Sequence, residues 1–520
     1  MKKSLFAVVV VSVALASVAD PAVPAEMATL MPRINPKPQK AEFRLTERVN
    51  VNTTPICICC DDGAAVAWAV RHLGVWLGGL PVPAVSAAPR GNGLPRGPEA
   101  YRLEAGPADV RIAANTLQGV RYALYTYRQT WEAGRGTARL THYTAPAMTV
   151  DDAPAMAFRG IHFCWMPKER GVTSAFMEHQ VRMAAYMKFN YVEIDNSGGI
   201  RSARHPEVCA SERRTAPMSE LKRIADVARD LGVTVIPGMA MLGHATLKGY
   251  QCGRHAALDP RPELQPLYEP RNGWNWCISN PHVHRLLGEL MDELLEACGN
   301  PPYFHVGCDE AQPPSCSVCC ATPYHEAVAA HLRRLHDHLK GRGVRMMMWH
   351  DMMLSAGDSR FRGFYCNGGP DADRILQSLP RDILVCDWYY GGCWGGQETF
   401  DTYPTLDYFQ KLGFDVVTCP WYNRPAAIAQ SKWVRDHGQF GVLMTTWGRL
   451  GGKKYYAVWQ HGPSDAWGTM DVGPVEYAFG EMDLATFWRQ CGWDMGLGED
   501  DADTFGFVPA TYPRIPDPED

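Results

Sequence analysis

The sequence predicts an α/β protein in which a small α+β domain precedes a (β/α)8 TIM barrel. From Phe158 to Trp447, eight strand-like runs alternate with amphipathic helical patterns, as a barrel of eight β/α units requires. No glycine-rich phosphate-binding turn follows the first of these strands, which argues against the alternative of a doubly wound sheet. With 520 residues, the chain is long enough for more than one domain.

The N-terminal segment has the pattern of a secretory signal peptide. Lys2 and Lys3 precede an apolar run from Phe6 to Ala16, and small residues allow cleavage after Ala19 or Ala25. This run is too short to cross a bilayer, and no other segment of the sequence is apolar enough to do so. We therefore expect a signal peptide over residues 1–25, no membrane insertion, and a secreted or periplasmic protein.

Residues 26–150 are expected to form a small, non-catalytic α+β domain. Residues 26–50 carry Pro32, Pro36 and Pro38 among charged residues and are interpreted as a leader into this domain. Alternating apolar residues predict two strands joined by a turn, and a helical period predicts two helices. The strands are Tyr101–Ala105 and Val110–Ala113, and the helices are Asp61–Leu77 and Thr116–Trp131.

The barrel domain is expected over residues 151–500, followed by a C-terminal tail at 501–520. Its predicted strands are Phe158–Trp165, Tyr191–Asp195, Val233–Met239, Tyr303–Val306, Val344–Trp349, Ile383–Asp387, Val416–Trp421 and Gly441–Trp447. Between the strands, Ser219 and Ser279 are expected to cap amphipathic helices, and Gly299 is expected to end the second of these.

The C-terminal ends of the predicted strands are rich in acids and tryptophan, and in a TIM barrel these ends form the active face. The polar and aromatic residues there are Arg159, His162, Glu193, Asp195, His244, Asp309, Glu310, Trp349, His350, Asp351, Asp387, Trp388, Trp421, Tyr422, Trp447 and Arg449. A single tryptophan at such a place is more often part of the core. Several at one edge, beside carboxylates, suit a pyranose, whose apolar faces stack on rings while its hydroxyls bond polar groups.

The run Tyr303–Glu310 is the centre of this face, because it ends in two adjacent carboxylates, Asp309 and Glu310, after the small residues Gly307 and Cys308. Sugar hydrolysis needs one carboxyl to donate a proton and another to stabilise positive charge. The alternative is a solvated acidic pair at the start of a helix.

Charge and cysteine content limit the partners. The net charge is −5, with no basic stretch that would indicate a nucleic-acid-binding face. The 17 cysteines include the clusters Cys57, Cys59, Cys60 and Cys316, Cys319, Cys320. The second cluster, near Cys308, is either a small zinc site or a set of disulfides. Export favours disulfides, and a single CxxC without a matching pair makes zinc the weaker alternative, so no metal or cofactor is assigned.

The segment His305-Val-Gly-Cys-Asp-Glu310 resembles the His-x-Gly-Gly-Asp-Glu signature of family-20 glycoside hydrolases, the β-N-acetylhexosaminidases. Further similarities follow in order along almost the whole chain after the signal peptide. They are Tyr101-Arg-Leu and Gly119-Val-Arg-Tyr-Ala-Leu in the first domain, Phe158-Arg159-Gly160 after Asp152-x-Pro154, Met187-Lys-Phe-Asn190, Gly243-His244, Trp349, Trp421-Tyr422 and Trp447-Gly448.

This resemblance implies an exo-acting hydrolase that removes terminal β-linked N-acetylglucosamine or N-acetylgalactosamine, with a glycan as its partner. It implies substrate-assisted retaining catalysis, in which the sugar's 2-acetamido oxygen attacks the anomeric carbon. Asp309 would orient the acetamido N–H, Tyr422 would bond its oxygen, and Glu310 would be the acid and then the base. Either His244 or His305 would support Glu310.

The resemblance also implies the substrate-binding residues. They are Arg159 for the ring hydroxyls, Trp349, Trp421 and Trp447 for the pocket walls, and Asp195 and Arg449 at the rim. Three positions depart from the family: Cys308 replaces a glycine, strand 2 ends at Glu193-Ile-Asp195 without the usual histidine, and Arg449 stands where an acid is common. An arginine there suggests an anionic sugar, such as a 6-sulfate, or an outward-turned side chain.

Two alternatives to this enzyme remain open. One is a glycan-binding relative with the same fold but no turnover, against which the presence of Asp309, Glu310 and Tyr422 speaks. The other is a metal-dependent hydrolase using His244, His305 and Asp309, which lacks a recognisable ligand spacing.

Overall fold

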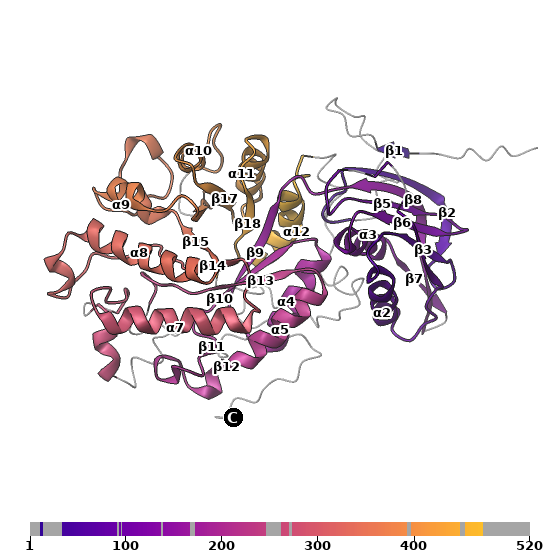
Figure 1. Ribbon diagram of the computed structural model, residues 1–520. Helices are drawn as coiled ribbons and strands as arrows, with labels where there is room; N and C mark the ends of the chain where they lie inside the picture. Colours follow the sequence, from indigo (N-terminus) through magenta and orange to yellow (C-terminus); the bar gives the residue numbers. More distant parts are fainter. Residues whose placement is uncertain are drawn as a thin grey trace, which may run out of the picture. The chain divides into compact units, whose positions relative to one another are not determined.

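The structure is a computed structural model that describes residues 11–13, 34–90, 93–94, 96–136, 139–166, 172–245, 262–269, 273–392, 397–447 and 453–471. It divides into two compact units. The first, here called the N-terminal unit, comprises Met1–Ala155, Tyr186–Lys188 and Trp467–Gly496. The second, the barrel unit, comprises Met156–Ala185, Phe189–Ala466 and Leu497–Asp520, and we describe each unit by itself (Figure 1). Apart from residues 11–13, the predicted signal peptide lies outside the described residues, as does the predicted tail.

The N-terminal unit is built on a mixed sheet with two helices. The strands are β1 (Val11–Val13), β2 (Lys40–Asn50), β3 (Ile56–Cys59), β4 (Val85–Ala88), β5 (Tyr101–Ala105), β6 (Val110–Ala114), β7 (Glu132–Gly136) and β8 (Arg139–Asp152). Their order is β1-β2-β8-β5-β6-β3-β4, and β7 pairs with β8. The helices are α2 (Ala65–Leu77) and α3 (Leu117–Gln129), and Thr116 caps α3 by accepting a hydrogen bond from the Gly119 amide. The β5–β6 hairpin and both helices lie where the sequence predicts them.

The leader predicted at residues 26–50 is wrong for its second half, which forms the long strand β2. Phe43 and Val49 of β2 are buried while its charged residues are half-buried or exposed, so one side of the strand faces the core. The prolines at 32, 36 and 38 all precede the strand, where they do not interrupt its hydrogen bonds.

A buried ion pair lies inside the N-terminal unit. Lys188 Nζ is 3.2 Å from Asp152 Oδ2, and both side chains are fully buried. Tyr101 donates to the same oxygen at 2.8 Å, and Trp467 Nε1 donates to Oδ1 at 3.0 Å. Lys188 also donates to the Tyr101 hydroxyl at 2.8 Å. Burying two charges is tolerated only when they are paired and hydrogen-bonded, and here both carboxylate oxygens have donors.

The barrel unit is a closed barrel of parallel strands, which confirms the predicted TIM fold. The strands are β9 (Phe158–Cys164), β10 (Tyr191–Asp195), β13 (Thr234–Gly238), β14 (Tyr303–His305), β15 (Arg345–Trp349), β16 (Leu384–Trp388), β17 (Asp415–Cys419) and β18 (Gly441–Met444). They follow one another in chain order around the barrel, and β18 closes it by pairing with β9. The prediction extends β17 to Trp421, but the strand ends before Pro420, which has no amide hydrogen to donate.

The interior of the barrel is packed with side chains. Phe158, Ile236, Met347, Leu384, Val417 and Leu443 belong to one buried cluster inside it. Gly160 of β9 is the residue that this packing requires, because a Cβ atom there would lie 2.7 Å from both Leu443 and Phe158. A filled interior leaves the strand ends, rather than a central pore, to form a site.

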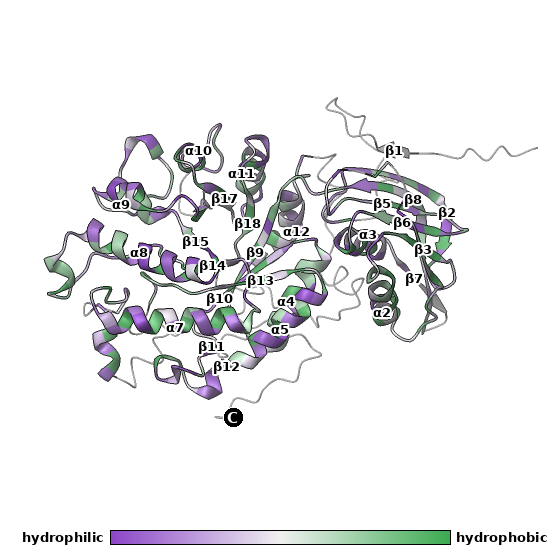
Figure 2. Cartoon of the chain, in the orientation of Figure 1, coloured by the Kyte–Doolittle hydropathy of each residue, from purple (hydrophilic) through white to green (hydrophobic). Residues whose placement is uncertain are grey.

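Helices follow most of the barrel strands. They are α4 (Ser174–Tyr186), α5 (Met218–Asp230), α7 (Pro281–Ala297), α8 (Tyr324–Gly341), α9 (Ala372–Ser378), α10 (Pro404–Lys411), α11 (Arg424–Asp436) and α12 (Lys453–Trp467). Hydrophilic and hydrophobic residues lie side by side along α7 and α8 in Figure 2, and most of the buried residues of these helices are apolar. A short pair, β11 (Ile200–Arg201) and β12 (Ala216–Pro217), lies between β10 and α5.

Short 3-10 helices lie in the loops, at η2 (Pro206–Val208), η3 (Glu212–Arg214), η4 (Pro262–Leu267), η5 (Cys319–Ala321), η6 (Asp351–Met353) and η7 (Ser359–Phe361). The predicted caps Ser219 and Ser279 are both wrong. Asn280 caps α7 by accepting from the His282 amide, because Pro281 takes the first helical position. Pro217 precedes α5, so Ser219 lies within the helix.

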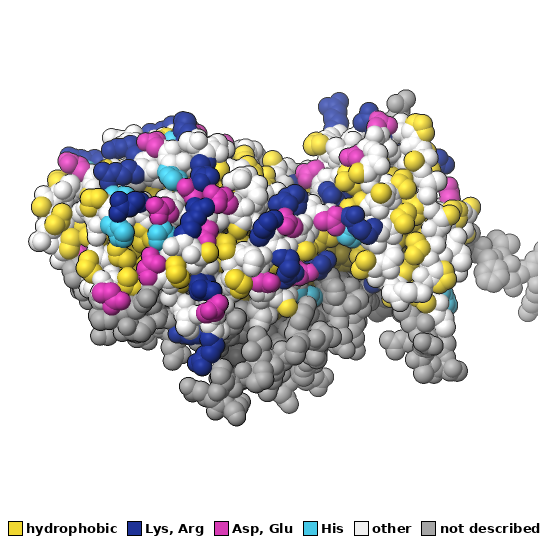
Figure 3. Space-filling model, turned by 60° about the horizontal axis from the view of Figure 1, so that its bottom comes forward, with side chains coloured by type: hydrophobic (Ala, Val, Ile, Leu, Met, Phe, Trp, Pro, Cys, Tyr) yellow, Lys and Arg dark blue, Asp and Glu magenta, His cyan; other side chains and the backbone are white. Residues whose placement is uncertain are grey.

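The surface of the barrel unit mixes charges of both signs. Basic and acidic side chains are interspersed on the face shown in Figure 3. Ion pairs such as Arg182–Glu178, at 2.6 Å, and Arg229–Asp226, at 2.7 Å, link neighbouring residues. None of the helices in the described ranges is long and apolar enough to cross a bilayer.

Candidate active site

The loop after β14 carries the two predicted carboxylates in an unusual backbone conformation. Gly307, Cys308 and Glu310 have φ values of 64°, 72° and 45°. Residues other than glycine rarely adopt this left-handed region, and such strain often occurs at functional sites. The surrounding structure holds the loop: the Glu310 amide donates to Asp351 Oδ2 at 2.9 Å, and a Cβ on Gly243 would lie 2.3 Å from the Asp309 carbonyl oxygen. The tight turn aims two consecutive side chains at the barrel mouth.

His244 lies between the two carboxylates, and we call His244, Asp309 and Glu310 the charged trio. His244 Nε2 is 3.3 Å from Asp309 Oδ2 and 3.3 Å from Glu310 Oε2. The side chains of Glu310, His244 and Asp309 are 48%, 35% and 13% exposed, so solvent and substrate can reach the trio. Trp274 packs its ring 4.2 Å from the His244 ring, and its Nε1 donates to the Glu310 carbonyl at 2.8 Å.

His244 and Asp309 are charged near neutral pH. Burial disfavours the imidazolium, but Asp309 and Glu310 together raise the pKa of His244 to about 10. Burial would raise the pKa of Asp309, but His244 lowers it below the usual range. One cation thus lies between two acids at the mouth of the barrel, and Asp309 stays ionised.

Asp351 supports the trio from the next strand. Besides the Glu310 amide, its Oδ2 accepts from Asn367 Nδ2 at 2.8 Å, and its Oδ1 accepts from Trp388 Nε1 at 3.3 Å. Burial, followed by the charge of Asp309, raises the pKa of Asp351 to about 6. Its partners come from the loop after β14, from the loop between β15 and β16, and from the end of β16, so this carboxylate links the loop of Glu310 to the next two β/α units. Asn367 is a residue that the sequence did not reveal, because no periodic pattern or motif marks it.

Uncharged polar groups lie beneath the trio inside the barrel. His305 Nδ1 accepts from the Gly307 amide at 3.1 Å and lies 3.5 Å from Glu193 Oε1. Burial lowers the pKa of both His305 and His162 to about 3, so both imidazoles are neutral. Burial, with Asp195 and Asp309 nearby, raises the pKa of Glu193 well above its usual value. Of the two histidines expected to support Glu310, the structure therefore brings His244 to it and places His305 against Glu193.

An aromatic row runs along the C-terminal ends of β15 to β18. Trp349 packs 5.3 Å from Trp447, whose Nε1 donates to the Tyr390 hydroxyl. Tyr390 packs 5.3 Å from Trp421, and Trp421 packs 4.7 Å from Tyr422. The row also reaches the buried polar groups inside the barrel, because Trp349 lies 4.3 Å from the His305 ring. The sequence does not reveal Tyr390, since it follows β16 by two residues and no motif contains it.

Two of the remaining predicted residues, Arg159 and Asp195, bond to partners other than the trio in the described part of the chain. Arg159 is buried near the start of β9, where its Nη1 donates to the Met156 carbonyl at 2.8 Å, and its predicted contact with sugar hydroxyls stays untested. Asp195, at the end of β10, accepts a hydrogen bond from the Ser197 hydroxyl. Arg449 lies outside the described residues.

Among the described residues, two groups have the spacing of metal ligands. One is Glu269 with Cys277, Cys316 and Cys319, and the other is His162 with Cys164 and Asp195. Neither contains the set His244, His305 and Asp309 that a metal-dependent hydrolase would use.

Comparison with known proteins points to one family. Residues 189–388 match the model described as glycosyl hydrolase family 20, catalytic domain. A beta-hexosaminidase of Porphyromonas gingivalis is 23% identical over 327 residues, which are 56% of this chain and 40% of that protein. A beta-hexosaminidase of Emericella nidulans is 25% identical over 325 residues, which are 56% of this chain and 49% of that protein. The chain thus spans less than half the length of these curated relatives.

A solved structure shares the fold. The beta-N-acetylhexosaminidase of Bacteroides fragilis aligns with a TM-score of 0.62 at 18% identity, covering 90% of this chain and 99% of that one. The matched family segment begins just before β10 and ends with β16, so it contains the loop of Asp309 and Glu310.

Proposed function

This chain belongs to glycosyl hydrolase family 20, and from that premise we propose that it hydrolyses the bond of a terminal β-linked N-acetylhexosamine. The observation that carries the proposal is the charged trio: two consecutive carboxylates on a strained loop, bridged by His244 at 3.3 Å. Asp309 is buried, whereas Glu310 is open to solvent. Curated relatives named beta-hexosaminidase give independent support for the same reaction class.

Glu310 is the proton donor in this proposal. In the first step, the acetamido oxygen of the substrate forms a bond to the anomeric carbon while the glycosidic bond breaks. Its electron pair goes to the departing oxygen, which takes the proton from the Glu310 carboxyl. In the second step, Glu310 takes a proton from water while the water oxygen bonds to the anomeric carbon. The bond from that carbon to the acetamido oxygen breaks, and its electron pair restores the acetamido group. Glu310 suits both steps because half of its side chain is exposed.

Asp309 stabilises the charge that develops on the acetamido group. The nitrogen becomes partly positive during the first step, and an ionised carboxylate that accepts its N–H favours that state. Asp309 meets this need because His244 holds its pKa low. Tyr422, at the end of the aromatic row, is assigned to the acetamido oxygen on the resemblance of its position in the chain.

His244 is a positioning residue. It contacts both carboxylates, and its own ring is held against Trp274 at 4.2 Å. Its charge keeps two acids close together that would otherwise repel each other.

The aromatic row forms the wall for the pyranose ring. Trp349 packs against Trp447, and Tyr390 joins them to Trp421. Trp421 and Trp447 are only partly buried, so they are the rings available for stacking on a flat sugar face. The proposed exo-action follows if the row closes the end of the site, so that only a terminal sugar enters.

A panel of aryl glycosides tests the proposal. We expect cleavage of β-N-acetylglucosaminides or β-N-acetylgalactosaminides and no cleavage of β-glucosides, which lack the internal nucleophile. NMR of the fresh product should show the β-anomer first, as retention requires. Release of the α-anomer first, or equal cleavage of glucosides, would contradict the mechanism. Binding of N-acetylglucosamine without turnover of any substrate would instead identify a glycan-binding relative.

We also propose that Arg449 binds an anionic group, such as a sulfate, on the terminal sugar. A guanidinium donates hydrogen bonds to sulfate but cannot accept them from hydroxyls. The test compares 6-sulfated and unsulfated N-acetylglucosaminides on the wild type and Arg449→Ala. An advantage for the sulfated sugar of about ten- to a hundredfold, lost in the variant, is expected for a hydrogen bond to a charged group. If the ratio of activity on the sulfated sugar to activity on the unsulfated sugar is the same in Arg449→Ala as in the wild type, Arg449 does not determine which substrate is chosen.

Export is the last part of the proposal, and it rests on the pattern of Lys2, Lys3 and the run Phe6–Ala16. Expression of the full chain in a bacterial host, followed by fractionation and N-terminal sequencing, should give a mature protein beginning at Asp20 or Glu26. An uncleaved chain in the cytosol would contradict it.

A further inference from the structure

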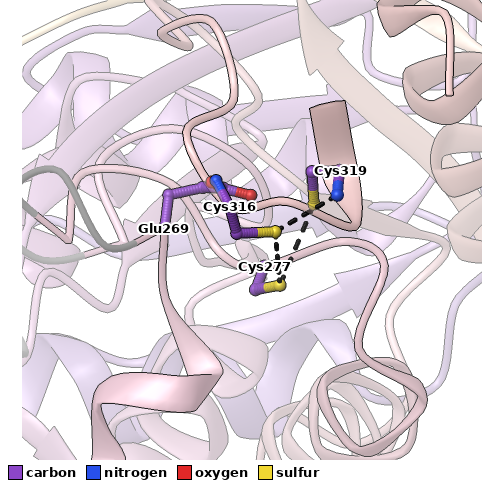
Figure 4. A group of neighbouring side chains, drawn as sticks. All are labelled: Glu269, Cys277, Cys316 and Cys319. Atoms are coloured by element: carbon purple, nitrogen blue, oxygen red, sulfur yellow. Dashed lines mark hydrogen bonds between the residues drawn. The ribbon is translucent and has the colours of Figure 1, made fainter. Parts of the chain in front are cut away.

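Two loops of the barrel unit bring three cysteines and one carboxylate together. Glu269 and Cys277 lie between β13 and α7, whereas Cys316 and Cys319 lie between β14 and α8. One ligand atom from each of the four residues lies within 4.8 Å of all the others (Figure 4). Cys277 and Cys319 are buried, and Cys316 is half-buried. We call this group the thiol cluster.

The sulfur positions fit a tetrahedral ion. Cys277 Sγ lies 3.8 Å from Cys316 Sγ and 3.8 Å from Cys319 Sγ. Zinc–thiolate bonds are about 2.3 Å long, and a tetrahedron with such bonds has edges of about 3.8 Å. A disulfide needs about 2.05 Å between sulfurs, so the observed spacing suits a shared ion better than a covalent pair.

The backbone around the cluster is also arranged for metal binding. The Cys319 amide donates to Cys316 Sγ at 3.2 Å, which stabilises negative charge on that sulfur. Glu269 Oε2 accepts from the amides of Ser315 and Cys316 at 2.7 and 2.8 Å. These bonds fix the carboxylate beside the cysteines and supply the outer-shell contacts that metal ligands commonly have.

We propose that Glu269, Cys277, Cys316 and Cys319 bind one zinc ion as a structural site. On binding, the three thiol S–H bonds break, the protons pass to solvent, and three Zn–S bonds and one Zn–O bond form without any change of oxidation state. Three thiolates and one carboxylate around a doubly charged cation fill all four positions of a closed tetrahedral site.

The site would position the charged trio without taking part in chemistry. The segment that leads to Cys277 is already joined to the loop of Glu310, because Trp274 Nε1 donates to the Glu310 carbonyl at 2.8 Å. Asn275 and Gln312 exchange two further hydrogen bonds, of 2.6 and 3.1 Å. An ion shared by both loops would fix this contact in place. The zinc site is independent of the proposed sugar hydrolysis, since the geometry of the thiol cluster supports it and metal content tests it.

Elemental analysis of the full-length protein, purified without chelator, is the test. The wild type should contain about one zinc per chain, as a closed four-ligand site takes one ion. Cys316→Ser should lose it. Cys320→Ser is the matched control, because Cys320 is the adjacent cysteine, is exposed and lies outside the cluster. This control should keep the zinc.

Cobalt substitution keeps the test decisive if Cys316→Ser does not fold. Cobalt(II) replacing zinc in the wild type should give thiolate-to-metal charge-transfer absorption, and Glu269→Gln should weaken metal binding at least about tenfold. Wild-type protein with neither zinc nor this absorption would overturn the proposal, as would a mapped disulfide between any two of the three cysteines. Zinc that remains in Cys316→Ser would also overturn it.

Discussion

The N-terminal unit and the barrel unit each hold carboxylates beside a cation, but in opposite surroundings. Asp152 and Lys188 are fully buried, and both oxygens of Asp152 accept hydrogen bonds from neighbouring side chains. Asp309, Glu310 and His244 are partly exposed, and their contacts of 3.3 Å are longer than well-formed charged hydrogen bonds. The same chemical groups therefore serve stability in one place and remain available for reaction in the other.

The difference lies in what the surrounding chain leaves open. A buried pair that has all its partners has nothing to offer a substrate, and breaking it leaves a charge without compensation. The trio lies on a loop with positive φ angles, held from behind by Asp351. Substitutions in the charged trio should therefore lower activity, whereas substitutions in the Asp152–Lys188 pair should lower stability.

Glu310→Gln should have the largest effect on activity and almost none on stability. Without its proton donor, cleavage of natural disaccharides should fall roughly 10²- to 10⁴-fold. Aryl glycosides with good leaving groups, which need little protonation, should be affected far less. Glu326→Gln, at an exposed glutamate of α8, is the matched control and should behave as the wild type. Equal losses on both kinds of substrate would argue against Glu310 as the acid.

Lys188→Met should show the opposite pattern. It leaves Asp152 buried without its cation, which should lower the free energy of unfolding by about 3–5 kcal/mol. At temperatures where the variant is folded, kcat should equal that of the wild type. Denaturant titration and steady-state kinetics on the same preparation measure both quantities. Adding Asp152→Asn to Lys188→Met should restore part of the lost stability. If Lys188→Met had normal stability but a low kcat, the contrast between the two charged groups would be contradicted.

His244→Gln should have a smaller effect that depends on pH. The pKa of His244 is raised to about 10 in the folded protein, from about 6.5 in an unfolded chain. Its contribution to stability is therefore full below about pH 6.5 and is lost as the pH rises towards 10. The difference in melting temperature between wild type and variant should narrow over this range. Activity near neutral pH should fall about tenfold, and a constant difference in melting temperature would show that His244 is not charged.

Trp421→Leu should have the smallest effect. Loss of one stacking surface of the aromatic row costs about 0.5–1.5 kcal/mol, so KM should rise roughly two- to tenfold with little change in kcat. Trp433→Leu, on α11 outside the row, is the control. A large fall in kcat in Trp421→Leu would mean that the row acts on the reaction and not only on binding.

The barrel and its two acids could be predicted because local patterns define them. Each barrel strand is a short apolar run bounded by helices, and Asp309 and Glu310 adjoin one of these runs. The sequence does not predict strand β2 because charged residues alternate with its buried ones, so its apolar pattern is weak. The observed starts of α5 and α7 differ from the predicted ones because prolines at 217 and 281 determine where those helices begin.

The rest of the site depends on contacts between distant residues. Asn367 reaches Asp351 across 16 residues, and Tyr390 meets Trp447 across 57. The sequence placed Cys316 and Cys319 in one cluster with Cys320, but Cys277 joins them from 39 residues away while Cys320 stays outside. No local period encodes such contacts, since the order of barrel strands in space creates them.

The reactivity of the substrate's own acetamido group tests the central claim most directly. The measurement is kcat/KM for a series of aryl β-N-acylglucosaminides whose acyl group carries none, one, two or three fluorine atoms. Fluorine withdraws electrons from the carbonyl oxygen, so kcat/KM should fall steeply and regularly along the series if that oxygen is the nucleophile. If kcat/KM did not change along the series, and a sugar were trapped covalently on a carboxylate of the protein, the substrate-assisted mechanism would be contradicted.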